Sequence, residues 1–265
     1  MTHDKERNIK TWKAMGKDIA ILCVELRKRM LEYCEHEKKK RDLLMMDLVR
    51  RCECNLFAVL SLAKVSLQGK GNIYLKLPVG LLLRSCFADC IMGLYVSILS
   101  DEEIEKLAQT LNEEYVASLF SRAEVYKDKV RDVLPYDDDL LEGWYTMQIE
   151  DHYLNYLVPN PDEKNRRLCT IWKVEKTGKH ITLQDMVKAM QKSTEMNAAV
   201  KQLFAYYKYF SQYEHFSEAA HGDTLVDFGM DNVSYVKAID ALGTGIHLIL
   251  ERVEGNCHSP ILVKV

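Results

Sequence analysis

Proline and glycine are scarce in this chain. Its 265 residues contain 5 prolines and 12 glycines, and neither residue type occurs between Lys17 and Gln68. Long, uninterrupted secondary-structure elements are therefore expected, which excludes collagen-like, mucin-like and β-meander chains. The composition, 48% hydrophobic and 28% charged, is that of an ordinary globular protein with a substantial core.

A large net charge is also missing. The 36 basic and 39 acidic side chains give a formal charge of -3, so no overall positive field attracts nucleic acid to the whole surface. The charge is unevenly distributed, because residues 1–54 have 14 basic and 10 acidic side chains whereas residues 101–165 have 6 and 17. This polarity favours self-association or a basic ligand, and two ordinary solvated faces would produce it as well.

The short motifs of common enzyme and metal-binding classes are absent. The sequence has no Gly-x4-Gly-Lys-Ser/Thr phosphate loop, no His-Glu-x2-His zinc motif, no Gly-x-Ser-x-Gly elbow and no Cys-x2-Cys pair. Cys86 and Cys90 have the spacing of two ligands on one helix, but they lack a neighbouring second pair. We therefore expect no bound metal and no cofactor.

Eight cysteines are spread through the sequence, and most of them fall on apolar helical faces. In such positions cysteine behaves as a small hydrophobic residue. The chain starts without a charged segment followed by an apolar signal core. We expect reduced thiols and a cytoplasmic location.

The N-terminal part of the chain has the periodicity of helices. Apolar residues recur at steps of three and four over residues 9–33 and again over residues 43–62. The charged stretch 35–42 separates the two sets and is interpreted as the corner of a helical hairpin. One continuous helix is the competing interpretation, because nearly all residues of this stretch are good helix formers.

The most apolar helix is expected at residues 77–99, with Pro78 in its first turn. Its length would nearly span a bilayer, but Arg84 and Asp89 lie near its middle. We therefore expect this helix to lie at the centre of a bundle, and we expect no membrane association.

Capping residues mark the helices that follow. Ser100 precedes an acidic first turn, and Thr182 precedes a short helix. Ser193 precedes a long aromatic helix that runs to about His221. Between these helices, residues 136–180 are the least regular part of the chain, and residues 170–174 are compatible with a short strand.

A last helix is expected at residues 233–253, where Gly243 and Gly245 allow close helix packing. The sequence thus predicts an all-α protein, a bundle of long antiparallel helices with one irregular insertion at about 136–180. No internal repeat is present, and residues 1–265 are expected to form a single helical domain.

Arg84 is the first candidate functional residue. A guanidinium in the middle of the most apolar helix needs an acceptor, because an unpaired buried charge costs several kcal/mol, roughly. Asp89 is five residues away and on another face, so the partner is expected on a different helix. Arg84 either fixes the packing of two helices or lines a pocket and holds an anion.

The aromatic helix supplies the second set of candidates. Tyr213, Ser217 and His221 continue an apolar stripe and place two hydroxyls and an imidazole on it. Ser217 and His221 are one turn apart, and a histidine with a pKa near neutrality is a natural proton-transfer group. The alternative is structural, because a histidine in a last helical turn also complements the helix dipole.

Arg84 in an apolar helix, followed by Tyr213-x3-Ser217-x3-His221, resembles the pattern of the uncharacterised bacterial domain-of-unknown-function 5677 family. The resemblance covers roughly residues 40 to 250, as judged from these short motifs. It departs from the family at Ala88, where the family usually has an acidic residue, and Asp89 follows instead. The resemblance implies an α-helical fold and a pocket. It implies no particular reaction, because the family has no established activity.

A more distant similarity is to HEPN proteins, helical bundles that often act as metal-independent ribonucleases in bacterial defence through an Arg-x4-6-His motif. Two such spacings occur here, Arg29 with His36 and Arg252 with His258, about as many as chance supplies. A composite of Arg84 and His221 from separate helices is the alternative arrangement.

Two hypotheses follow. In the first, the protein binds or cleaves RNA or a nucleotide in a bacterial defence or stress context, with Arg84, Ser217 and His221 as catalytic residues and Tyr213 and Asp89 as substrate-binding residues. In the second, it is a non-catalytic helical interaction protein that forms a homodimer or binds another protein, and the same residues only set core packing. The sequence leaves open whether the protein is an enzyme.

Overall fold

The apolar stripe of residues 9–33 forms the helix α1 (Thr2–Tyr33), and the second stripe forms α2 (Lys40–Gln68). The computed structural model describes residues 2–33, 40–68, 75–125, 153–159, 172–174, 177–192, 196–211 and 228–254. Trp12, Met15, Ile19 and Leu26 of α1 are fully buried, as the periodicity predicts.

The helices α1 and α2 pack against each other in opposite directions. Arg27, late in α1, forms an ion pair with Glu53 in the first half of α2. Gly16, earlier in α1, lies beside Leu60, later in α2. One continuous helix could not make these contacts, so the hairpin interpretation is confirmed.

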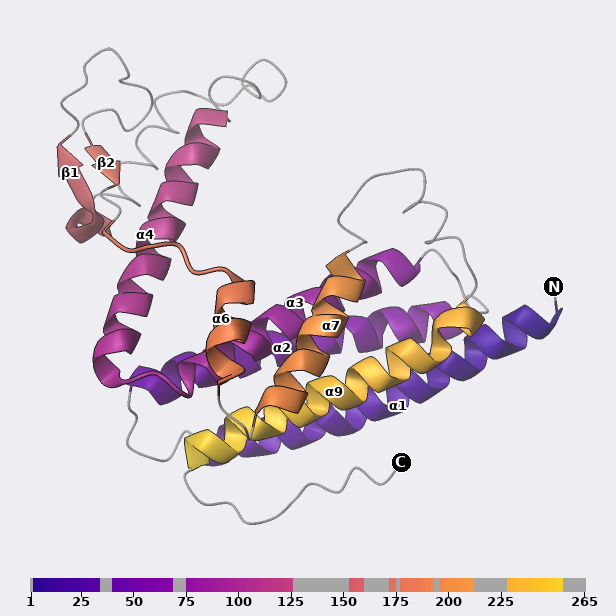
Figure 1. Ribbon diagram of the computed structural model, residues 1–265. Coiled ribbons are helices and arrows are strands. Elements are labelled where there is room, and N and C mark those ends of the chain that lie inside the picture. The colour runs from indigo at the N-terminus through magenta and orange to yellow at the C-terminus, as the bar shows by residue number, and fades with distance from the viewer. Residues whose placement is uncertain are drawn as a thin grey trace. The chain divides into compact units, whose positions relative to one another are not determined.

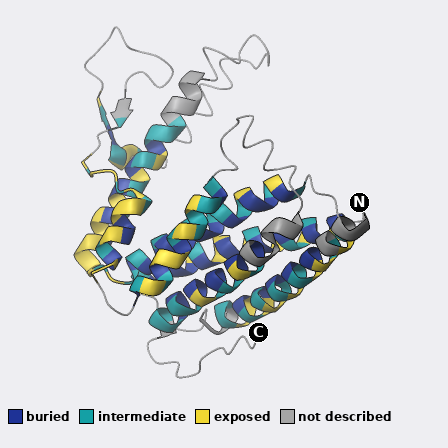
Figure 2. Ribbon diagram, turned by 45° about the vertical axis from the view of Figure 1, so that its right-hand side comes forward, coloured by how far each residue is buried: buried dark blue, intermediate teal, exposed yellow. Residues whose placement is uncertain are grey.

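The apolar helix α3 (Lys76–Val96) lies among other helices, as predicted. It packs against α2, α6 (Leu183–Met190), α7 (Asn197–Ser211) and α9 (Phe228–Glu254). Figure 1 shows α9 running beside α1 and α7 crossing this group, and Figure 2 shows the buried positions on the helix sides that face one another.

In the part of the chain that the structure describes, α3 is the only helix long and apolar enough to cross a membrane. That test uses length and composition alone, and a buried core helix passes it as well. Twelve residues of α3 are buried against protein, which fits the predicted central position. The absence of membrane association stays a prediction.

The glycines of α9 differ in their surroundings. A Cβ atom at Gly245 would lie 2.6 Å from the Cys90 Sγ atom and 3.0 Å from the Leu203 Cδ1 atom. A Cβ atom at Gly243 would meet nothing within 4 Å. The predicted role in close packing is therefore confirmed for Gly245 and is wrong for Gly243.

Four of the five described cysteines are buried, at positions 23, 52, 86 and 90. Burial raises the pKa of the Cys23 thiol to about 11 and that of the Cys90 thiol well above its usual value. Protonated, buried thiols pack as small hydrophobic groups. These cysteines thus belong to the core, as the sequence predicted.

The described chain divides into two compact units. Unit 1 consists of residues 1–99 and 181–265, and unit 2 consists of residues 100–180. The structure therefore groups α4 (Asp101–Val125) with the irregular segment and not with the other helices. The single domain over residues 1–265 stays a prediction.

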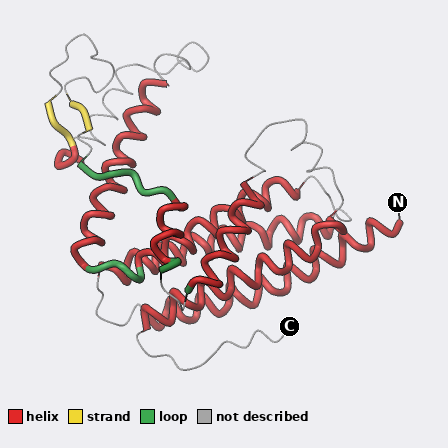
Figure 3. The backbone as a smooth tube through the Cα atoms, viewed as in Figure 1, coloured by secondary structure: helices red, strands yellow, loops and turns green. Residues whose placement is uncertain are grey.

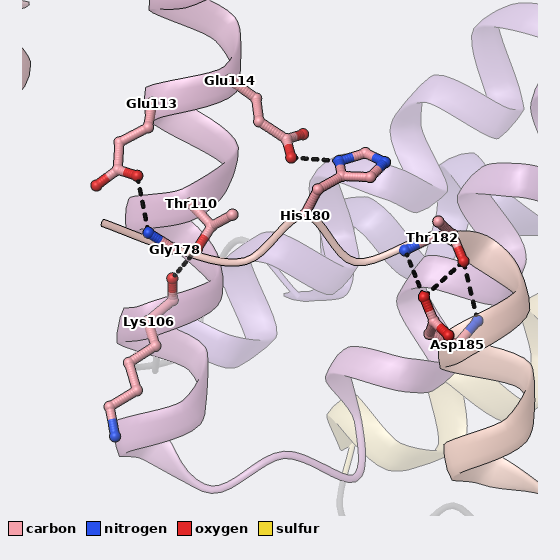
Figure 4. Close-up of polar contacts among 8 residues, drawn as sticks. All are labelled: Lys106, Thr110, Glu113, Glu114, Gly178, His180, Thr182 and Asp185. Atoms are coloured by element: carbon pink, nitrogen blue, oxygen red, sulfur yellow. Dashed lines mark hydrogen bonds and ion pairs between the residues drawn. The ribbon is translucent and has the colours of Figure 1, made fainter. Parts of the chain in front are cut away.

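Unit 2 begins with the predicted cap of α4. The Ser100 amide and hydroxyl both donate to the Glu103 carboxylate at 2.8 Å, and the Glu103 amide donates to the Ser100 hydroxyl at 3.3 Å. This reciprocal capping box satisfies amide groups that have no partner within the helix. The same arrangement at Thr182 and Asp185 begins α6, where it was also predicted (Figure 4).

The irregular part of unit 2 includes a short turn, η3 (Leu154–Tyr156), and two strands, β1 (Leu157–Pro159) and β2 (Trp172–Val174). The strands pair antiparallel with Leu157 opposite Val174. The strand β2 lies within residues 170–174, which the sequence left compatible with a short strand. Apart from this small sheet, the regular structure of the described residues is helical (Figure 3), and the predicted all-α bundle is correct.

Candidate functional site

Arg84 lies on α3 and reaches α7, the neighbouring helix. Its Nε donates to the Ser211 hydroxyl at 3.2 Å, and its Nη2 donates to the Tyr207 hydroxyl at 3.0 Å. The guanidinium carbon also lies 4.9 Å from the centre of the Tyr207 ring, within cation–π range. The prediction that Arg84 finds partners on another helix is confirmed.

Ser211 is itself held in place, because its hydroxyl donates to the Tyr207 carbonyl at 2.7 Å. Tyr207 and Ser211 are one helical turn apart and present their hydroxyls to the same guanidinium. Both of these hydroxyl groups are neutral acceptors, and together they orient the guanidinium. The result is a partly buried cation with a fixed direction on the surface where α3 meets α7.

The neighbouring stripe of α7 forms the aromatic core of unit 1. Phe210 is fully buried, stacks on Phe87 with ring centres 5.8 Å apart, and contacts Tyr235 edge to face at 5.2 Å. Tyr206 also stacks on Phe87, at 5.5 Å. These contacts fix the rotation of α7 and thereby turn Tyr207 and Ser211 toward Arg84.

Asp89 contacts a different helix. Its Oδ1 atom pairs with Arg51 Nη2 of α2 at 3.1 Å, and its Oδ2 atom is buried with no hydrogen-bond partner among the described residues. Burial raises the pKa of the Asp89 carboxyl to about 6, and the Arg51 charge offsets part of that rise. The contacts shown thus join Arg84 to α7 and Asp89 to α2, and they do not bring the two residues into one site.

The other predicted site residues, Tyr213, Ser217 and His221, lie outside the described residues. So do His36 and His258, the histidines of the two Arg-x4-6-His spacings. Their predicted roles, and the adjacency of Arg84 and His221, stay predictions.

Unit 2 contains a second candidate site, an open pocket of about 370 Å³. Its walls come from one face of α4 and from the segment 177–180, which lies beside that face (Figure 4). The lining residues are Thr110, Glu113, Glu114, Ala117, Ser118, Gly178 and His180.

Glu113 attaches the segment 177–180 to α4. Its buried carboxylate accepts hydrogen bonds from the Thr177 amide at 2.9 Å, the Thr177 hydroxyl at 2.5 Å, the Gly178 amide at 3.2 Å and the Gln109 side chain at 2.9 Å. Burial alone would raise the pKa of Glu113, but the hydrogen bonds from Thr177, Gln109 and Gly178 lower it below its usual value. The ionised carboxylate is therefore a structural anchor of this pocket.

We expect Glu113→Gln to lower the stability of unit 2 by about 1 to 3 kcal/mol at neutral pH, because hydrogen bonds to a charged acceptor are lost. The depressed pKa makes this contribution disappear as the pH falls below the usual range of glutamate. Hydrogen exchange at the Thr177 and Gly178 amides measures the effect. Glu102→Gln, which changes an exposed carboxylate on the same helix, is the control. Unchanged protection in Glu113→Gln would contradict the anchoring role.

The Glu114 carboxylate pairs with Nδ1 of His180 across the same pocket (Figure 4). A carboxylate on one ring nitrogen orients an imidazole. His180 itself is 68% exposed, so solvent screens the pair. The pair places an imidazole beside a carboxylate in this pocket.

Sequence reasoning identified Arg84 but missed its partners Tyr207 and Ser211. It assigned function to Tyr213, Ser217 and His221, whereas the Arg84 guanidinium contacts the neighbouring stripe of α7, at Tyr207 and Ser211. The sequence did contain a signal for these partners. Tyr207 and Ser211 are two hydroxyl residues one helical turn apart, next to the apolar stripe of the aromatic helix. No comparable signal joined Glu113 or Glu114 to residues 177–180, since these contacts span 64 to 66 positions.

Among the described residues, no three His, Cys, Asp or Glu side chains gather as metal ligands. No protein-family model, curated protein or solved structure matches this chain.

Proposed function

We propose that this protein binds a phosphate group of RNA or of a nucleotide, with Arg84 as the residue that holds it. The orientation of Arg84 by the Tyr207 and Ser211 hydroxyls is the observation that supports the proposal. Arginine is suited to this task because its planar donors match phosphate oxygens in pairs. A guanidinium that is already fixed loses less conformational freedom when it binds an anion.

The composition of unit 1 is compatible with an anionic ligand. Residues 1–99 and 181–265 contain 25 basic and 21 acidic side chains, whereas residues 100–180 contain 11 and 18. Electrostatic attraction between unit 1 and phosphate is therefore favourable, although the whole chain is slightly acidic. The proposed context, bacterial defence or stress, rests on the distant similarity to HEPN proteins alone.

The test is the binding of a fluorescently labelled RNA oligonucleotide and of a labelled nucleotide, followed by anisotropy. We expect Arg84→Gln to weaken binding roughly tenfold or more, because a desolvated charge-assisted contact is lost. Ser211→Ala keeps the charge and removes one orienting hydroxyl, so a smaller loss is expected. Arg50→Gln, an exposed change on α2, is the control that should bind normally.

Circular dichroism and thermal unfolding show whether each variant folds. Normal RNA and nucleotide binding by a folded Arg84→Gln variant would refute the proposal. If Arg84→Gln instead loses binding only because it unfolds, the proposal would be refuted by a folded Ser211→Ala variant that binds like the parent. In that case Arg84 only joins α3 to α7.

Incubation with total RNA then separates binding from catalysis. Cleavage that survives EDTA and disappears in a folded His221→Ala variant would identify a metal-independent ribonuclease. Binding without cleavage would identify a binding module, and His221 would then have no catalytic role.

A further inference from the structure

A row of aromatic and basic side chains runs along one side of α7. Phe204, Tyr207, Lys208 and Ser211 occupy positions i, i+3, i+4 and i+7, so they lie on one face of the helix. Phe204 and Tyr207 are half-buried, whereas Phe210 on the next stripe is fully buried. The two half-buried rings therefore lie at the edge of the core, with part of their surface open to solvent.

The rings of Phe204 and Tyr207 lie close together, and each has a cation beside it. Their centres are 6.0 Å apart and their planes differ by 14°. The Arg84 guanidinium carbon lies 4.9 Å from the centre of the Tyr207 ring, and the Lys208 ammonium nitrogen lies 5.4 Å from the centre of the Phe204 ring. We call these four residues the α7 aromatic surface, defined by Arg84, Phe204, Tyr207 and Lys208.

The charges that α7 contributes to this surface are all positive. From Asn197 to Ser211 the sequence of α7 has two lysines, Lys201 and Lys208, and no aspartate or glutamate. Lys201 is exposed and lies one turn before Phe204 on the same face. A negatively charged ligand that reaches Arg84 along α7 therefore passes lysines and aromatic rings.

Aromatic rings combined with basic side chains are the composition of surfaces that bind single-stranded nucleic acid. The bases stack on the rings, and the cations follow the phosphate backbone. A duplex keeps the faces of its bases stacked inside, so it gains nothing from such rings. A phosphate group without a base would contact Arg84 but would not use Phe204.

We propose that the α7 aromatic surface binds an unpaired base of single-stranded RNA, which stacks on Phe204 while Arg84 and Lys208 contact neighbouring phosphates. Lys208 is exposed, so its flexible ammonium group is free to move from the ring to a phosphate as the base takes its place. This inference rests on the phosphate role proposed for Arg84 and adds to it the recognition of a base.

The test compares three labelled RNA probes by anisotropy: a single strand, the same backbone without its bases, and a duplex. The parent protein should bind the single strand most tightly. Phe204→Leu keeps an apolar side chain but removes the ring, so it should weaken binding of the single strand roughly tenfold and leave binding of the base-free strand unchanged. Phe57→Leu is the matched control and should bind like the parent, because Phe57 is an exposed phenylalanine of α2 that also has an arginine, Arg27, beside its ring.

Arg84→Gln separates this inference from the phosphate proposal, because it should weaken binding of the single strand and of the base-free strand alike. If Arg84→Gln weakens both and Phe204→Leu weakens neither, base stacking is refuted and the phosphate proposal stands. If Arg84→Gln weakens neither, the phosphate proposal fails, and the inference that rests on it fails as well.

Two further results would refute base stacking. An equal loss of both strands in a folded Phe204→Leu variant would show that the ring only supports Arg84. A parent protein that binds the base-free strand or the duplex as tightly as the single strand would show that it does not read unpaired bases, and this measurement holds even if Phe204→Leu does not fold.

Discussion

Asp89→Asn is expected to stabilise the protein at neutral and alkaline pH and to leave its stability unchanged near pH 4. The Asp89 side chain is only 6% exposed, and burial raises its pKa from 3.8 to about 6 against the partial effect of Arg51. The folded protein therefore holds this proton more tightly than the unfolded chain does. Asparagine keeps the shape and the acceptor for Arg51 without the buried charge.

The sign follows from proton binding. Between about pH 4 and pH 6 the folded state binds more protons at Asp89 than the unfolded state, so the free energy of unfolding falls as the pH rises through this window. Well above pH 6 this decrease in the free energy of unfolding is complete, and the shift in the Asp89 pKa corresponds to a decrease of about 1 to 3 kcal/mol. Asp89→Asn removes this loss, so the difference between variant and parent should grow with pH and then level off.

Chemical denaturation at several pH values between 4 and 8 measures the difference. Asp47→Asn is the matched control, because Asp47 is an exposed carboxylate on α2 beside Arg50 and should give no such pH dependence. A variant less stable than the parent at pH 8 would show that attraction to Arg51 outweighs the cost of burial. Buried carboxylates with a raised pKa are common at functional sites, so a destabilising Asp89 would fit its prediction as a site residue.

The fold was predictable because it depends on local patterns. The spacing of Trp12, Met15 and Ile19 requires a helix with one buried face, and the scarcity of glycine and proline leaves little else to interrupt it. The caps at Ser100 and Thr182 are equally local, since each involves residues three positions apart. Both the helices and their starts could therefore be predicted from the sequence.

The candidate sites were less predictable because they depend on rotation and on distant contacts. Arg84 was conspicuous as a charge among apolar residues, but which stripe of α7 it meets depends on how Phe210 packs between Phe87 and Tyr235. A shift of one residue along α7 exchanges Tyr206 for Tyr207 as the neighbour. The pocket of unit 2 depends on Glu113 meeting Gly178, and no periodicity links them.

Gly245→Ala and Gly243→Ala should change stability in opposite directions, although the two glycines are two positions apart on one helix. In a helix, alanine in place of glycine gains about 1 kcal/mol. At Gly243 a Cβ atom meets nothing, so that gain should appear in full. At Gly245 the Cβ atom would lie 2.6 Å from the Cys90 Sγ atom, and overpacking of this kind costs about 1 to 3 kcal/mol.

Urea denaturation tests this pair, with stability read from the midpoint at unchanged slope. Adding Cys90→Ala to Gly245→Ala removes the sulfur atom that the new methyl group meets, so the double variant should recover part of the loss while Cys90→Ala alone is destabilising. Equal midpoints for Gly243→Ala and Gly245→Ala would mean that α3 and α9 do not approach as closely as the structure places them. A lower midpoint for Gly245→Ala alone would show that close contact at Cys90 and Leu203 is what requires glycine there.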